Sequence, residues 1–320
     1  MRANRRKEFS MSTRDDGRGQ PRNRENAIVV GVDDSSASQS ALDWAAGEAQ
    51  SRGLGLLVLH SVNVPALPGS VKGSSPKRDL AAVARQLLRA ATERVATRFG
   101  PGLDVRAETS DLAPTQALVS ASRTAAMVVV GSRGSNGAAP LSLGSVSTRV
   151  SAHAFSPVAV VPASAASGTE GHGGGRPVVV GVDGSSGAEV ALRFALEEAA
   201  RTETGLVVVH AWEAPVLIGG STWDPAPHTA VLEAQATGAQ ESVRAMVREA
   251  RGPHTEQVPC SVEVVRDQPA HALLVRGERA GLIVVGTRGR GGFAGLLLGS
   301  VSRTVLHHAT VPVVVARAPA

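Results

Sequence analysis

The 320-residue sequence has few of the residues that define several common classes of protein. It has one cysteine, Cys260, which excludes an intramolecular disulfide framework and favours a reducing compartment. Aromatic residues make up 2% of the chain, which leaves little for stacking on single-stranded nucleic acid. No apolar run approaches the roughly 20 residues of a membrane-spanning helix. We therefore expect a cytoplasmic protein with no membrane segment and no specific nucleic-acid partner.

The excess of positive charge lies mostly in the first 26 residues. The formal net charge of the chain is +5, and residues 1–26 hold eight Arg or Lys against four Asp or Glu. This segment has no apolar stretch of the kind that a secretory signal needs, and Met11 offers an alternative first residue. We expect residues 1–26 to form a disordered basic tail, and the rest of the chain to be nearly balanced in charge.

Acidic residues are absent from two long windows, Leu112–Thr169 and Arg279–Ala320. Each window contains arginines and a glycine-rich loop, GSRGSNGAAPLSLGS at 131–145 and GTRGRGGFAGLLLGS at 286–300. A surface without carboxylates lowers the cost of bringing in a polyphosphate, and guanidinium groups favour it. The alternative, that apolar strands and Ala/Ser-rich helices simply lack acids, would have to hold twice.

The recurring loop is one part of a tandem duplication. The segment AIVVGVDDSSASQSALDWA at 27–45 matches PVVVGVDGSSGAEVALRFA at 177–195, an offset of 150 residues, and the loops are offset by 155. A period of about 150 residues is the size of one α/β domain. The sequence predicts a first domain at 27–163, a Gly/Ser linker without regular structure at 164–176, and a second domain at 177–317.

Each copy alternates Val-rich strands with segments of helical spacing. Strands without polar alternation are buried on both faces, so we predict two doubly wound α/β domains with parallel sheets flanked by helices. The ligand crevice of such a sheet lies at the carboxyl ends of its strands. Asp33 and Asp183 follow the first strand of each copy, near the glycine loop if strands one and four are neighbours. The alternative is that each Asp caps the helix that follows it.

Glycines allow backbone amides to approach a phosphate closely, and a helix N-terminus adds unpaired donors. The P-loop pattern GxxxxGK followed by Ser or Thr is absent, which excludes a P-loop NTPase. A loose GxGxxG/A begins at Gly289, but it comes late in its domain and no acidic residue follows it. A dinucleotide fingerprint is therefore excluded as well.

Together these motifs resemble the universal stress protein family in its ATP-binding branch. The resemblance rests on VGVD with a following Ser, a fourth strand ending in GSRG or GTRG, a nine-residue arc, and GSVS before a helix. It covers residues 27–162 and 177–317. It implies a five-stranded sheet of order 3-2-1-4-5 in each domain, ATP bound without a Walker motif, and a cytoplasmic stress regulator. It also implies pairing of the two domains within the chain and a homodimer through the fifth strands.

The resemblance also implies the site, residue by residue. The adenosine part or its metal would lie against Val32, Asp33, His60 and Ser61 in the first copy, and Val182, Asp183, His210 and Ala211 in the second. Ribose and phosphates would border Gly131, Arg133, Gly134, Gly286, Arg288 and Gly289. Amides and hydroxyls for the β- and γ-phosphates would come from Gly144, Ser145, Val146, Ser147, Gly299, Ser300, Val301 and Ser302. Mg²⁺ would accompany ATP, although no dedicated protein metal site is visible.

Three functions are compatible with this site. We favour an ATP-binding regulatory module whose nucleotide occupancy changes domain pairing or partner binding; the second is a slow ATPase or nucleotide-transfer enzyme, and the third a nucleotide-free scaffold. No nucleophile, base and orienting group recur at matched positions, so no catalytic residue is assigned. A bulky residue at Gly286 or Gly299 should abolish ATP retention and keep the fold.

The first copy has the less favourable phosphate loop. Asp34 adds a carboxylate beside the site, Pro140 interrupts the arc, and nothing matches Arg290 of the second copy. We therefore expect ATP affinity in the second domain to equal or exceed that in the first.

Overall fold

A computed structural model of the chain describes residues 26–62, 76–134, 143–167, 175–213, 225–289 and 297–318. The basic tail, the linker residues 168–174, and Pro140 and Arg290 of the arcs lie outside these residues. The first half has the elements β1 Ile28–Gly31, α1 Ser36–Arg52, β2 Leu56–Ser61, α2 Pro76–Phe99, β3 Val105–Ser110, α3 Pro114–Ala121, β4 Met127–Gly131, α4 Ser145–His153, β5 Val158–Val161 and η1 Ala163–Ser167.

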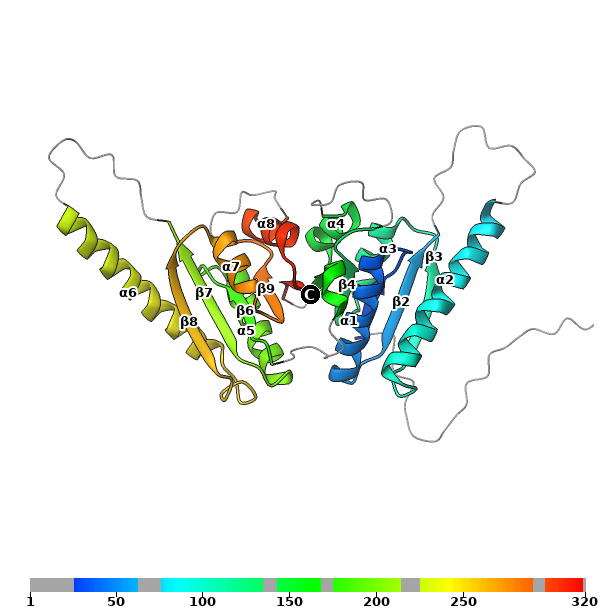
Figure 1. Ribbon diagram of the computed structural model, residues 1–320, viewed down its shortest axis with the longest axis horizontal. Coiled ribbons are helices and arrows are strands. Elements are labelled where there is room, and N and C mark those ends of the chain that lie inside the picture. The colour runs from blue at the N-terminus through cyan, green and yellow to red at the C-terminus, as the bar shows by residue number, and fades with distance from the viewer. Residues whose placement is uncertain are drawn as a thin grey trace, which may run out of the picture.

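The second half repeats the first, without the 3-10 helix η1, within the described residues. Its elements are β6 Val178–Gly181, α5 Ser186–Arg201, β7 Leu206–Trp212, α6 Pro225–Ala250, β8 Cys260–Arg266, α7 Pro269–Gly277, β9 Leu282–Gly286, α8 Ser300–His308 and β10 Val313–Ala316. Within this part of the chain, the strands form a ten-stranded sheet of order β3-β2-β1-β4-β5-β10-β9-β6-β7-β8 (Figure 1). Each half therefore has the predicted order 3-2-1-4-5, and the predicted fold class is confirmed.

Buried β-branched residues explain the central strands. β1, β4 and β5 consist almost entirely of valine, isoleucine, methionine and alanine, and their side chains are buried on both faces of the sheet. One apolar cluster lies between the sheet and α1, α2, α5 and α6. The other lies between the sheet and α3, α4, α7 and α8. Each cluster contains residues of both halves, so the two halves share their cores. No described helix has the length and hydropathy that a membrane span requires.

The two halves join at their fifth strands. β5 and β10 pair antiparallel, with Val160 opposite Val313 and Val158 opposite Val315. β5 also pairs with β4, and β10 with β9, so both edges of each strand are occupied. A homodimer through the fifth strands, as expected from the sequence, has no open strand edge in this arrangement. It would require the pairing within the chain to open.

The start of the predicted linker is ordered, contrary to expectation. Residues 163–167 form η1, which lies against α1, because the chain is tied down there on both sides. Ser40 Oγ donates to the Ala163 carbonyl at 3.1 Å, and Ser164 Oγ donates to the Thr310 carbonyl at 3.2 Å. Composition alone predicts no regular structure for this Ser-rich stretch, because composition carries no information on hydrogen bonds to distant parts of the chain.

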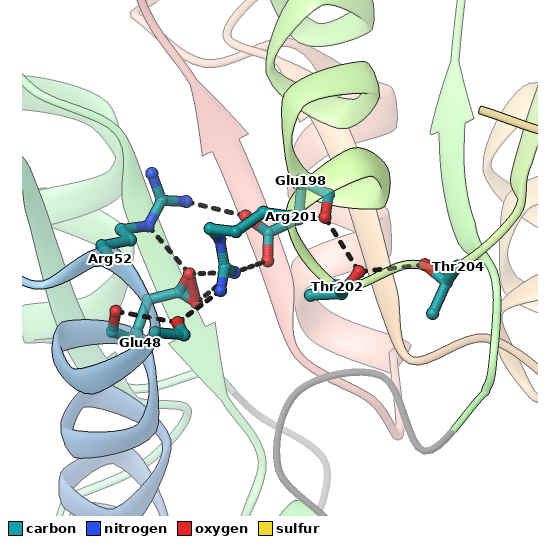
Figure 2. A network of polar contacts seen from close by, with 7 residues as sticks. Glu48, Arg52, Glu198, Arg201, Thr202 and Thr204 are labelled. Carbon is teal, nitrogen blue, oxygen red and sulfur yellow. Dashed lines mark hydrogen bonds and ion pairs between the residues drawn. The ribbon is translucent and has the colours of Figure 1, made fainter. Parts of the chain in front are cut away.

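Four charged side chains fasten α1 to α5 across the junction (Figure 2). Glu48 and Glu198 are buried, at 0% and 3% exposure. Arg52 contacts Glu48 at 2.9 Å and Glu198 at 2.7 Å, and Arg201 pairs with the same two carboxylates. Burial acts to lower the pKa of Arg52, but the charges of Glu48 and Glu198 outweigh it and raise that pKa above its ordinary value. The cluster is electrically balanced, two anions against two cations.

Removing one cation from this cluster should destabilise the fold. We expect Arg201→Ala to lower the free energy of unfolding by about 3 kcal/mol, because two buried carboxylates would then share one arginine. The matched control is Arg193→Ala on the same helix, whose exposed ion pair with Glu189 spans 3.7 Å and should contribute at most about 1 kcal/mol. Urea unfolding of the full chain measures both; equal losses would contradict a special role for the cluster.

Candidate functional site

The predicted neighbours β1 and β4 place the two halves of each site together. β1 pairs in parallel with β4, and β6 with β9, so the segments that follow these strands emerge side by side. A Cβ placed on Gly134 would lie 2.8 Å from Asp33 Oδ2, and one on Gly289 would meet Asp183 Oδ2. The sequence prediction that each Asp lies beside the glycine loop is therefore confirmed.

The carboxylates shape the turn before the helix but do not cap it. The N-cap residues are Ser35 and Ser185, so the capping alternative for Asp is wrong in its choice of residue. Asp33 Oδ1 accepts from the Ser35 amide at 3.0 Å and from its hydroxyl at 2.5 Å. Asp183 makes the same pair of bonds with Ser185, at 3.0 and 2.6 Å. Each carboxylate is thus held in place by the following turn.

Each glycine arc is closed by a backbone hydrogen bond at its base. The Gly144 amide donates to the Ser132 carbonyl at 2.8 Å, and the Gly299 amide donates to the Thr287 carbonyl at 2.7 Å. Residues 135–142 and 290–296, between these anchors, lie outside the described residues. The amides of Gly144 and Gly299 are consequently already used, and a ligand would depend on the amides that follow them.

Those following amides are presented without a side-chain cap. α4 begins after Gly144 and α8 after Gly299; neither glycine can make a side-chain capping bond, and neither first turn contains an acidic residue. The first amides of a helix have no partner within the helix, and they carry the positive end of its dipole. Ser145 and Ser300, the first residues of these helices, are exposed. Both helix starts are therefore suited to an anion.

A cavity lies beside each helix start, about 440 Å³ in the first half and about 370 Å³ in the second. All the predicted site residues of the first half line its cavity: Val32, Asp33, His60, Ser61, Gly131, Arg133, Gly134, Gly144, Ser145, Val146 and Ser147. In the second half the lining includes Val182, Asp183, Ala211, Gly286, Arg288, Gly289, Gly299, Ser300, Val301 and Ser302, but not His210. The two cavities thus bring together all the residues that the sequence analysis assigned to the sites, except His210.

Comparison with known proteins agrees with this architecture. The model of the universal stress protein family matches residues 26–162 and 175–317. The chain belongs to the universal stress protein family. A universal stress protein of Mycobacterium tuberculosis strain H37Rv is 38% identical over 305 residues, covering 91% of this chain and 96% of its own. One from Mycolicibacterium smegmatis is 36% identical over 303 residues, covering 92% and 97%.

Solved universal stress proteins share the fold. One from Archaeoglobus fulgidus superposes with a TM-score of 0.64 at 23% identity, and the alignment covers 92% of this chain and 97% of that one. A universal stress protein in complex with cAMP aligns with 44% of this chain and 96% of its own, at 26% identity and a TM-score of 0.31. The second similarity is too low to inform on the ligand of this chain.

Two predicted phosphate contacts are turned inward in this universal stress protein. Ser147 Oγ donates to the Gly131 carbonyl at 2.6 Å, and Ser302 Oγ donates to the Gly286 carbonyl at 2.6 Å. Both serines are buried, at 3% and 4% exposure. Their hydroxyl protons hold the helix to the end of the neighbouring strand and are therefore not available to a phosphate.

A histidine contacts the backbone that follows the first strand of each half. His60 Nδ1 lies 2.8 Å from the Val32 carbonyl, and His210 Nδ1 lies 2.9 Å from the Val182 carbonyl. Each strand-end histidine therefore positions backbone. Its bond uses the carbonyl of Val32 or Val182, residues that the resemblance places against the adenosine part. Ser61 Oγ donates to the Leu112 carbonyl at 2.5 Å.

Sequence reasoning missed the apolar side of both cavities. The first is also lined by Gly31, Ser38, Leu59, Pro114, Ala117, Leu118 and Val130. The second is also lined by Gly181, Ala188, Val209, Pro269, Leu273, Val285 and Leu298. A signal was present, since Pro114 and Pro269 open α3 and α7 at the same carboxyl edge of the sheet in both universal stress protein domains.

One glycine of each motif is needed for packing rather than for a ligand. A Cβ on Gly131 would lie 2.7 Å from the Ala37 carbonyl carbon, and one on Gly286 would lie 2.6 Å from the Gly187 oxygen. These are backbone atoms of α1 and α5, which cannot move aside cheaply. The expectation that a bulky residue at Gly286 would spare the fold is therefore wrong. At Gly299 the nearest atom is 3.4 Å away, an ordinary contact.

The same substitution should destabilise the fold at Gly286 and be tolerated at Gly299. We expect Gly286→Ser to lower the free energy of unfolding by about 1–3 kcal/mol through overpacking. Gly299→Ser should leave it within about 0.5 kcal/mol, because serine is a favoured N-cap residue. Thermal unfolding of both variants provides the measurement. Equal stability of the two variants would contradict the overpacking argument, because it would mean that β9 and the start of α5 can move apart at little cost.

Proposed function

We propose that this protein is an ATP-binding regulatory module with one nucleotide site in each domain, and that it acts in the cytoplasm. The uncapped starts of α4 and α8, each opening on a cavity, are the observation that carries the proposal. Both cavities fall within the roughly 300–1,000 Å³ typical of small-molecule sites. The free thiol of Cys260, whose pKa is raised by burial, accords with a reducing compartment.

The residues present fit an adenine nucleotide. The first-turn amides of α4 and α8 would hold the terminal phosphates, and the exposed Arg133 and Arg288 would supply positive charge beside them. The apolar walls contributed by α3 and α7 would receive the adenosine part. A Cβ at Gly134 or Gly289 would press against the carboxylate of Asp33 or Asp183, so glycine lets the loop lie close to it without displacing that side chain.

Magnesium would be held chiefly by the nucleotide itself. Among the described residues there is no group of three or more His, Cys, Asp or Glu suited to a metal ion. Asp33 and Asp183 are the carboxylates that line the cavities. Bound Mg²⁺ would neutralise phosphate charge next to such a carboxylate and so relieve their repulsion, which suits an ion that prefers few protein ligands and several waters.

Nucleotide occupancy would act on partner binding rather than on domain pairing. The halves share one sheet, two apolar clusters and a balanced cluster of buried charges, so opening them would cost much of the stability of the fold. The exposed first residues of α4 and α8, Ser145 and Ser300, bring the expected phosphate end of each site to the surface. A bound triphosphate would change the charge of that surface, which a partner protein can read.

A slow ATPase or nucleotide-transfer enzyme is the second candidate, favoured by the exposed Ser145 and Ser300 at the expected phosphate end. The nearest carboxylates that line the cavities are already engaged with the turns after β1 and β6. A single turnover with labelled ATP separates the two candidates. Intact nucleotide retained in proportion to protein supports the regulator, whereas catalytic release of product supports the enzyme.

An aspartate at the N-cap should block each site without harming its helix. Gly144 and Gly299 have extended backbone conformations that aspartate adopts readily as an N-cap. We expect Gly144→Asp and Gly299→Asp each to lose one ATP per chain, and the double variant to lose both, because the new carboxylate occupies the anion position. Native mass spectrometry with added ATP counts the nucleotides bound per chain.

Alanine variants at the same positions are the control, since alanine adds a Cβ but neither caps the first-turn amides nor adds charge. Retention of two nucleotides by the Asp variants would contradict the proposed site.

The Asp variants also isolate the sites within the intact chain. We expect the second site, measured in Gly144→Asp, to bind ATP at least as tightly as the first, measured in Gly299→Asp, because exposed Asp34 lies beside the first site only. Tighter binding at the first site would contradict that order.

A further inference from the structure

Helix α8 reaches from one candidate site to the other. Its first residue, Ser300, lines the second cavity, and its last turn contains His307. Nine helical residues span about 13 Å. α4 and α8 lie on either side of the junction between the halves (Figure 1). A rigid helix of this length can therefore contact the second site with one end and the first half of the protein with the other.

The contact made by the far end falls next to the first site. The Leu143 amide donates to His307 Nδ1 across 3.5 Å, a long hydrogen bond. Leu143 directly precedes Gly144, the N-cap of α4, where the phosphate of the first site is expected. Burial, together with the neighbouring His308 and Arg303, lowers the pKa of His307. A lowered pKa favours the neutral ring, whose Nδ1 can accept a hydrogen bond.

Helix α4 is held from the second half at its other end too. Arg317, just after β10, donates from Nη2 to the carbonyl of Ser151 in the last turn of α4. Burial lowers the pKa of Arg317. A cation at a helix C-terminus is favourable, so this contact also suits the dipole of α4. Both flanks of the helix that opens the first site are thus bonded to groups of the second domain.

The arrangement is one-sided. Duplication places Ala152 where the second half has His307, and Pro162 where it has Arg317. Neither residue has a side chain that can repeat the contact. In the reverse direction Ser164 reaches the Thr310 carbonyl, beyond the C-cap of α8 and away from the start of that helix. Among the described residues, only the first site therefore has its N-cap flank bonded to a side chain of the other domain.

We propose that α8 couples the two nucleotide sites, and that His307 is the positioning residue that transmits occupancy of the second site to the start of α4 in the first. The inference rests on the proposed function. A phosphate bound at the start of α8 fixes the position of that helix, and His307 then fixes the Leu143–Gly144 segment. Coupling is reciprocal, so filling the first site changes the affinity of the second by the same factor.

The test is a cycle of calorimetric ATP titrations on the full chain. The affinity of the first site is measured with the second site filled, in the wild type, and with it blocked, in Gly299→Asp. We expect the two values to differ by about fivefold, the low end of allosteric coupling, because the linking hydrogen bond is long. In His307→Ala the ratio should fall to one. His307→Asn, whose Oδ1 can accept from Leu143, should restore it.

His308→Ala is the matched control, because it removes an exposed imidazole from the same turn. Burial, the largest cause of the lowered pKa of His307, remains, so His307 can still accept from Leu143 and the coupling ratio should keep its wild-type value. A purely structural role for His307 would change stability or both affinities without changing the ratio. Hydrogen exchange gives a second readout in Gly144→Asp, where ATP can enter only the second site. ATP should slow exchange at 297–305 and also alter it at 143–150, and His307→Ala should abolish the second effect alone.

The outcomes distinguish the two proposals. Protection at 297–305 without any change at 143–150, or a coupling ratio of one in the wild type, overturns the coupling and leaves ATP binding intact. A ratio that His307→Ala does not alter overturns the role of His307. No protection at either segment, together with no calorimetric binding of ATP, overturns the proposed function and the coupling with it.

Discussion

The antiparallel pairing of β5 with β10 is the constraint on which the rest of the molecule depends. It turns two five-stranded sheets into one of ten strands, and it makes both apolar clusters continuous across the halves. Without it, two short strands made almost wholly of buried valine and alanine would be exposed edges, open to pairing with other chains. The same pairing leaves the sheet with β3 and β8 as its edges, which carry charged residues such as Arg106 and Glu263.

The pairing of β5 with β10 also determines which helices meet on each face of the sheet. On one face α1 and α5 approach closely enough for Glu48 and Glu198 to be buried together, which is tolerable only because Arg52 and Arg201 come with them. On the other face α4 and α8 carry the two candidate phosphate ends. Both sites therefore lie along one continuous sheet with shared apolar clusters, so a signal between them would pass through small shifts of helices rather than through separation of domains.

The features that could be predicted from the sequence are those carried by motifs that occur in both copies. The features that could not are those set by how side chains from distant segments pack together. Strand order and the meeting of Asp33 with Gly134 followed from motifs that occur twice. The sequence could not distinguish Gly131, required by the backbone of α1, from Gly144, whose Cβ position is tolerant. Nor could it show that Ser147 turns its hydroxyl inward while Ser145, two residues earlier, stays exposed. The sequence shows Glu48 with Arg52 and Glu198 with Arg201 only as two separate helix pairs. It could not show that the two pairs, about 150 residues apart, meet as one buried cluster.

Tandem duplication permits an asymmetry that a homodimer cannot have. In a homodimer every substitution near the two-fold axis appears twice, so an arginine added beside buried glutamates brings a second one with it. Here Glu48 and Glu198 are equivalent, but Arg52 corresponds to Thr202 and Arg201 to Ser51. Each half thus supplies one arginine from a different position, and the charges balance. The same holds on the other face, where His307 corresponds to Ala152 of the first copy. A link that runs in one direction between the sites, instead of a symmetric pair of links, requires two copies that differ in sequence, as tandem duplication allows and a homodimer does not.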